Sequence, residues 1–273
     1  MSKKDNIFVF WWSSVKFEGK PKENFGDILS KYLVEKISNK RVIWKQPKKM
    51  TWNFFGKKVY FTTGSILSHA NKNTVVWGSG IISKKDEVDH AEFLAVRGPE
   101  TYNYLKSKNY KVSEVFGDPA VLLPKYYNPK HEKTHDLGII PHYVDFKKVN
   151  NWYANNDSIK VIDLLNNNIE DVVDDILSCN KIISSSLHGL IVSHAYYIPA
   201  VLVKFSDKLY GDGVKFIDYF KSVKLKPYDS VFIDEKPKNT FLETLFTNYE
   251  VLPKKNVMEH LGKSLLEVCP FKT

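Results

Sequence analysis

Short apolar runs alternate with amphipathic stretches along the chain, which is the pattern of an α/β protein. In the first half, the runs are rich in β-branched and aromatic residues and predict strands. They span residues 7–12, 41–44, 59–62, 74–77 and 92–96. Between them, apolar residues at helical spacing predict helices after Gly26 and after Pro99. A strand, a glycine-containing turn and a helix at the start are typical of a Rossmann-like domain.

The second half repeats the alternation after a polar, proline-containing stretch at residues 124–135 that fits a linker. Predicted strands are residues 137–140, 161–164, 181–183, 200–203 and 228–232, and predicted helices are 169–179, 187–198, 216–223, 241–249 and 257–268. We therefore predict two Rossmann-like domains with mostly parallel sheets. They would be residues 1–126 and 127–273. The C-terminal helices could pack back on the first domain.

A serine-rich turn between a predicted strand and a predicted helix marks the most informative stretch, Lys181 to Lys215. Serine hydroxyls are preferred helix N-caps, and the free N–H groups of a helix N-terminus bind anions. In an open α/β sheet, ligands bind at the carboxyl ends of the strands. We therefore expect Ser185, Ser186, His188 and Lys208 to meet at one sheet edge. The serines fit donors better than nucleophiles, because no Gly-x-Ser-x-Gly elbow surrounds them.

Four further residues are candidates for a site, and two of them, Arg97 and Asp27, have a structural alternative. Arg97 ends a predicted strand before a helix and could grip a carboxylate or phosphate, or form a structural ion pair. Asp27 could be a helix cap or a catalytic carboxylate. Gly26 permits close backbone approach by a ligand. His142 ends a strand of the second half and could line a cleft between the domains.

Composition narrows the partner classes. The 273 residues have a formal net charge of +9, which favours phosphorylated substrates, nucleic acid or an anionic membrane surface, unless the lysines are only a solvated face. The absence of an arginine-rich or aromatic-interleaved motif argues against nucleic acid. Two isolated cysteines, Cys179 and Cys269, give no metal-spaced set and fit a reducing compartment. The sequence has no apolar run of 18 residues, and its first apolar run fits a strand, so we expect a cytoplasmic protein. Because no metal-ligand cluster is visible, we also expect a metal-independent protein.

Six short motifs together resemble the polysaccharide pyruvyl transferase family over roughly residues 5–220. In chain order they are Asn24-Phe25-Gly26-Asp27, Trp77-Gly78-Ser79-Gly80, Val96-Arg97-Gly98-Pro99-Glu100-Thr101, Gly117-Asp118-Pro119, Ser186-Leu187-His188-Gly189 and Ser206-Asp207-Lys208. Each motif alone is weak, but their order is specific.

This resemblance implies a glycosyltransferase-B-like fold with the active site in the interdomain cleft. It implies transfer of the enolpyruvyl unit of phosphoenolpyruvate onto two hydroxyls of a sugar, releasing phosphate, with no cofactor. Bacterial relatives act on precursors of exopolysaccharide or capsule, often lipid-diphosphate-linked, at the inner face of the cell membrane. A basic surface suits such acceptors and an anionic membrane.

The family's donor pocket falls on Arg97, His188 and Lys208. The family usually has Tyr-Asp-Pro-Lys where this chain has Phe205-Ser206-Asp207-Lys208, so Lys204 competes with Lys208 for the donor role. Donor-binding predictions also include three residues of the serine turn: Ser185, Ser186 and Leu187. The predicted acceptor-binding residues are Asn24, Gly26, Trp77, Gly78, Ser79 and His142.

The reaction suggests roles for two side chains. His188 could protonate C3 of the donor as general acid, or bind phosphate as imidazolium. Asp27 would accept the proton of the sugar hydroxyl. Two alternative functions remain. A nucleotide-sugar glycosyltransferase on the same fold would need a carboxylate for the ribose, and no clear candidate is present. A basic phosphate-binding module without activity would have a defective donor pocket.

Overall fold

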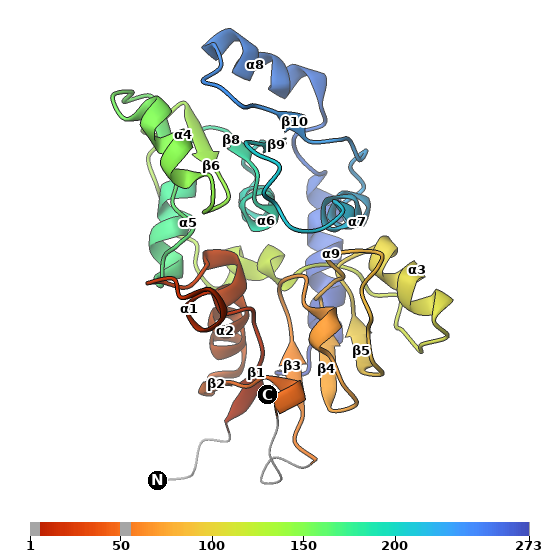
Figure 1. Cartoon of the computed structure of the whole chain (residues 1–273). Helices are drawn as coiled ribbons and strands as arrows, with labels where there is room; N and C mark the ends of the chain where they lie inside the picture. Colours follow the sequence, from red (N-terminus) through yellow and green to blue (C-terminus); the bar gives the residue numbers. More distant parts are fainter. Residues whose placement is uncertain (1–5, 50–55, 273) are drawn as a thin grey trace.

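The computed structural model describes residues 6–49 and 56–272. Figure 1 shows two α/β halves, one above the other, with the N-terminal half in the lower part of the view. In the lower half, five parallel strands form one sheet in the order β2-β1-β3-β4-β5. The strands are β1 (Ile7–Val9), β2 (Val42–Trp44), β3 (Val59–Phe61), β4 (Thr74–Trp77) and β5 (Glu92–Ala95). The helices are α1 (Ser14–Glu18), α2 (Phe25–Ser38) and α3 (Pro99–Ser107).

The C-terminal half repeats this plan. Its five parallel strands lie in the order β10-β9-β8-β6-β7, so in each sheet the first strand of the half lies between the second and the third. The strands are β6 (Leu137–Ile140), β7 (Ile159–Val161), β8 (Ile182–Ser184), β9 (Ala200–Lys204) and β10 (Val231–Phe232). The helices are α4 (Phe146–Tyr153), α5 (Ile169–Leu177), α6 (Leu187–Ala195), α7 (Val214–Ser222), α8 (Asn239–Asn248) and α9 (Lys255–Glu267).

Two parallel five-stranded sheets confirm the predicted α/β class and are consistent with two Rossmann-like domains. Some local predictions were wrong. The stretch after β1 contains α1, capped by Ser13, and the second half contains α4, which was not predicted. Strand β7 begins two residues before its predicted start and ends at Val161. The rest of the predicted strand enters an Asx turn, in which the Asp163 side chain accepts a hydrogen bond from the Leu165 amide. The glycosyltransferase-B likeness and the boundary at residue 126 stay predictions.

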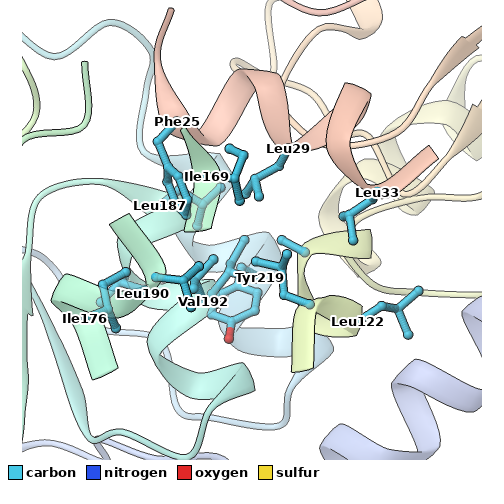
Figure 2. Packing of buried hydrophobic residues seen from close by; sticks show 14 of the residues in the cluster. Phe25, Leu29, Leu33, Leu122, Ile169, Ile176, Leu187, Leu190, Val192 and Tyr219 are labelled. Carbon is cyan, nitrogen blue, oxygen red and sulfur yellow. The ribbon is translucent and has the colours of Figure 1, made fainter. Parts of the chain in front are cut away.

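One hydrophobic core runs through both halves (Figure 2). Phe25, Leu29 and Leu33 of α2 are buried with residues of α5 and α6 from the other half. A second link is made by α9, which passes back beside the N-terminal sheet (Figure 1). There the Trp77 indole donates a 2.9 Å hydrogen bond to the carbonyl of Leu265. These contacts hold the two sheets in one arrangement.

A buried ion pair also joins the halves. Arg97 follows β5 and Asp218 lies on α7, and both side chains are fully buried with Nε and Oδ2 3.1 Å apart. The Asp218 carboxylate also accepts hydrogen bonds from the amides of Glu100 and Thr101, at 2.9 and 3.1 Å. Because Gly98 has no side chain to cap α3, Asp218 caps that helix from the other half of the chain.

Among residues 6–49 and 56–272, no helix combines the length and apolar character needed to cross a bilayer.

Candidate functional site

A pocket of 860 Å³ lies at the carboxyl ends of strands from both sheets. In each sheet the strand order reverses beside the first strand of the half, and ligands of doubly wound folds bind outside that point. The wall contains Trp12, which follows β1, and Gly64, which follows β3. From the second half it contains His142, which follows β6, and Ser186, which follows β8. Both reversal points therefore contribute to one pocket.

The imidazole of His188 lies in this wall, in the first turn of α6, and is 8 % exposed. Its Nε2 faces Oδ2 of the buried Asp118 carboxylate at 3.4 Å, and neither atom has a hydrogen-bond partner among the described residues. Its Nδ1 lies against Gly26, where a Cβ would come within 2.2 Å. The close approach that Gly26 permits is thus made by His188. The ring is thus oriented with Nε2 toward Asp118 and Nδ1 toward Gly26.

Asp118 was not among the predicted site residues, although it lies in the Gly117-Asp118-Pro119 motif. Its Oδ1 accepts a 3.0 Å hydrogen bond from the Ala120 amide at the start of a 3-10 helix, Pro119–Lys125. This bond fixes the carboxylate, and a fixed carboxylate can hold an imidazole in one orientation. The motif therefore places a buried carboxylate beside the imidazole of His188.

Asp27 lies in the pocket wall, in the first turn of α2. The cap of this helix is Asn24, whose side chain accepts a 2.9 Å hydrogen bond from the Gly26 amide, so the interpretation of Asp27 as the cap was wrong. Burial raises the pKa of Asp27 from 3.8 to about 7, and the nearby His188 partly opposes this shift. A carboxylate with such a pKa can accept a proton near neutral pH.

Lys215, which was not predicted, also lies in the wall, in the first turn of α7. Burial lowers its pKa to about 8; Arg97 adds to this effect and Asp27 opposes it. His142 lies in the wall as predicted, and burial together with Lys215 lowers its pKa to about 4. His142 is therefore neutral at pH 7, while Lys215 is mostly charged.

The predicted donor-binding residues separate into two layers. Ser186, Leu187 and Lys208 line the pocket. Ser185 is buried behind them, where its hydroxyl accepts a 2.8 Å hydrogen bond from the His142 amide. Arg97 is also outside the wall, in its ion pair with Asp218. Of the two competing lysines, Lys208 lies in the wall, whereas Lys204 pairs with Asp207 at 2.7 Å outside it.

The predicted acceptor-binding residues separate in the same way. Asn24 and His142 line the pocket, but Gly26 and the Trp77-Gly78-Ser79 motif do not. Trp77 is fully buried against α9. Gly78 has a φ of +103° and packs so closely on Pro119 that a Cβ would come within 2.2 Å. Ser79 donates a 2.8 Å hydrogen bond to the carbonyl of Gly64. The motif therefore supports the strand end behind the wall.

Glu18 connects the two halves at the pocket and was also not predicted. Its carboxylate accepts a 2.7 Å hydrogen bond from the Trp12 indole and a 2.6 Å hydrogen bond from the Tyr143 hydroxyl. All three residues line the pocket. Two aromatic rings from opposite halves are thus held in the wall, and such rings suit the apolar faces of a sugar.

Comparison with known proteins agrees with these motifs. The sequence profile of the family "Polysaccharide pyruvyl transferase" matches residues 24–207, which is more than half of the chain. The chain belongs to this family. It is also similar to an uncharacterized protein of Acanthamoeba polyphaga mimivirus, with 34% identity over 203 residues that cover 72% of this chain and 69% of the viral protein. Membership of the pyruvyl transferase family indicates that the chain is a transferase that acts in polysaccharide synthesis.

Within the described part of this pyruvyl transferase, no group of three or more His, Cys, Asp and Glu side chains is arranged to hold a metal ion. Metal independence stays a prediction.

The raised pKa of Asp27 predicts a pH-dependent stability difference between the pyruvyl transferase and its Asp27→Asn variant. Between pH 4 and pH 7 the folded state keeps a proton that the unfolded state loses, so the free energy of unfolding falls as pH rises. Asparagine cannot ionise. We expect the melting temperature of the variant, relative to the native protein, to be higher at pH 8 than at pH 5. Asp171→Asn, in the first turn of α5, is the matched control. A difference for Asp27→Asn that is the same at both pH values would contradict the raised pKa.

Proposed function

We propose that this chain transfers the enolpyruvyl unit of phosphoenolpyruvate onto two hydroxyls of a sugar in a cell-surface polysaccharide precursor, releasing phosphate and leaving a pyruvate ketal. The observation that carries this proposal is His188 in the wall of the shared pocket, beside the N-terminus of α6 and backed by Asp118. No cofactor is required, since phosphoenolpyruvate is the donor substrate.

Two lysines and a helix N-terminus in the pocket wall support an anionic donor. Phosphoenolpyruvate has a carboxylate and a phosphate, and it needs cations and backbone donors. Lys208 and Lys215 line the pocket, and Ser186 and Leu187 bring the N-terminus of α6 into the wall. The free N–H groups and the dipole of that helix end favour a phosphate or carboxylate.

The proposed chemistry begins with a proton on the imidazole of His188. This proton moves to C3 of the donor, which becomes a methyl group, and C2 becomes electrophilic. The oxygen of the first sugar hydroxyl forms a bond to C2, and its proton passes to Asp27. The C2–O bond to phosphate breaks and phosphate leaves. The second hydroxyl then forms the second C2–O bond of the ketal, and its proton passes to the imidazole of His188, which is thereby restored.

The acceptor would lie on the side of the pocket that contains Trp12 and Tyr143, with Asn24 and His142 as polar contacts. An aromatic ring packs against the C–H face of a sugar, while polar side chains bind its hydroxyls. A lipid-diphosphate-linked precursor at the inner face of a cell membrane suits the net charge of +9. We therefore propose a cytoplasmic enzyme with peripheral membrane contact and no nucleic-acid partner.

Ligand-dependent melting tests the donor without knowledge of the acceptor. A ligand that binds only the folded state stabilises it by about 2.7 kcal/mol at 100 times its Kd. We expect phosphoenolpyruvate to raise the melting temperature by several degrees and nucleotide sugars to leave it unchanged. If only a nucleotide sugar does so, the glycosyltransferase alternative replaces pyruvyl transfer.

A further inference from the structure

Lys215 differs from the other lysines of the pocket. Lys48, Lys85 and Lys208 are exposed, whereas Lys215 is half-buried. Among the described residues, no carboxylate lies within 4.0 Å of its amine, and its nearest recorded partner is the ring of Phe216 at 5.1 Å. An amine that has lost part of its water and gained no counter-ion is in an unfavourable environment, which a bound anion would improve.

The groups around Lys215 do not neutralise it. They are Arg97 from the end of β5, Asp27 from α2 and His142 from the segment after β6. Asp218 is already paired with Arg97, His142 is neutral at pH 7, and Asp27 is about half protonated there because its pKa is about 7. These groups therefore give Lys215 no full counter-charge at pH 7.

The guanidinium of Arg97 makes its hydrogen bonds outside the pocket or to the edge of its wall. Its Nε donates to Asp218 at 3.1 Å and its Nη2 donates to the carbonyl of Ile81 at 2.6 Å. Its Nη1 donates to the hydroxyl of Ser65, which lines the pocket. The guanidinium is thus fully buried behind the wall, and it reaches the pocket through Ser65.

We propose that Lys215 is a further donor-binding residue, whose ammonium contacts the phosphate or carboxylate of the donor, while Arg97 acts behind it as a positioning residue. This inference rests on the proposed function for the identity of the donor. An anion beside Lys215 supplies the missing counter-charge, and it does so in the first turn of α7, where the helix dipole adds to the attraction.

The first test compares two lysines of the same helix by titration calorimetry. Lys215→Met is expected to weaken phosphoenolpyruvate binding at least tenfold, because a charge-assisted contact is lost without a large change in volume. Lys221→Met is the matched control, because Lys221 is exposed and pairs with Glu100 at 2.6 Å outside the pocket. The affinity of this variant for phosphoenolpyruvate should equal that of the native protein. Unchanged affinity in a folded Lys215→Met protein would overturn the inference.

A second test uses the native protein and does not depend on a variant folding. An N-hydroxysuccinimide ester of acetate acylates neutral amines: the amine nitrogen forms an amide, and N-hydroxysuccinimide and a proton are released. The lowered pKa of Lys215 makes more of its amine neutral at pH 8. Mass spectrometry should show acetylation of Lys215 that phosphoenolpyruvate prevents, while labelling of Lys221 is unaffected by the ligand.

Inorganic phosphate separates the two proposals. If phosphate protects Lys215 but phosphoenolpyruvate neither binds nor protects, the anion contact stands and the proposed function fails. If phosphoenolpyruvate binds and neither anion protects Lys215, the proposed donor stands and this inference fails.

Discussion

His188→Gln is expected to lower the rate of pyruvyl transfer by about 10²- to 10⁴-fold, the usual contribution of a general acid. The affinity for phosphoenolpyruvate should change only several-fold, since glutamine still fills the space beside Gly26 but cannot deliver a proton to C3. The measurement is phosphate release from phosphoenolpyruvate with an acceptor found by screening, together with calorimetric binding of the donor. His131→Gln is the matched control, because His131 pairs with Asp174 at 2.8 Å outside the pocket.

Two other outcomes would change the role of His188. Near-normal turnover in His188→Gln would exclude the general acid. A loss of donor affinity as large as the loss of rate would make His188 a phosphate ligand in its imidazolium form. Asp118→Asn separates positioning from contact: it should lower kcat with little effect on donor affinity, and it should shift the pH profile of kcat because the carboxylate beside Nε2 is gone.

The second large effect concerns stability. Asp218→Ala is expected to reduce the free energy of unfolding by about 3–5 kcal/mol, the typical cost of removing one partner of a buried ion pair. The substitution leaves the Arg97 guanidinium buried without its counter-ion and removes the acceptor of the Glu100 and Thr101 amides. Denaturation in urea at pH 7 measures the change.

The control for this effect is again Lys221→Met, one turn further along α7. It breaks a surface pair in which Lys221 is 45% exposed, and we expect a loss of no more than about 1 kcal/mol. An equally small loss for Asp218→Ala would show that the contact between Arg97 and Asp218 contributes little to holding α3 and α7 together.

Most of the fold could be predicted from the sequence because the strands are apolar runs bounded by turn residues. Strands β3, β4 and β9 are such runs, and Pro99 begins α3 as expected. Helix α4 was missed because its sequence, FKKVNNWY, is half lysine and asparagine and has a short apolar face. The predicted position of strand β7 was too late in the chain, because Ile162 and Leu164 are apolar and buried although they follow the strand.

The residues of the site could be predicted only where they belong to short sequence motifs. His188, Asp27 and Lys208 come from such motifs, and the structure brings all three to one pocket. Lys215 and Glu18 have no local signal, because their importance depends on which elements surround them after folding. Trp77 shows the converse: its motif is distinctive, but the return of α9 buries the ring. Sequence position cannot distinguish a wall residue from one that supports the wall.

The pocket is built from two halves that share one core, and this arrangement affects how ligand affinity is determined. The contacts that align β1 with β6 are hydrophobic packing, a buried ion pair and the return of α9, all present before any ligand arrives. The conformational entropy of placing Trp12 opposite Tyr143 is therefore lost during folding and not during binding. Affinity is thereby coupled to global stability: a substitution deep in α9 that populates looser states would weaken binding in proportion to the fraction of preorganised molecules that remains.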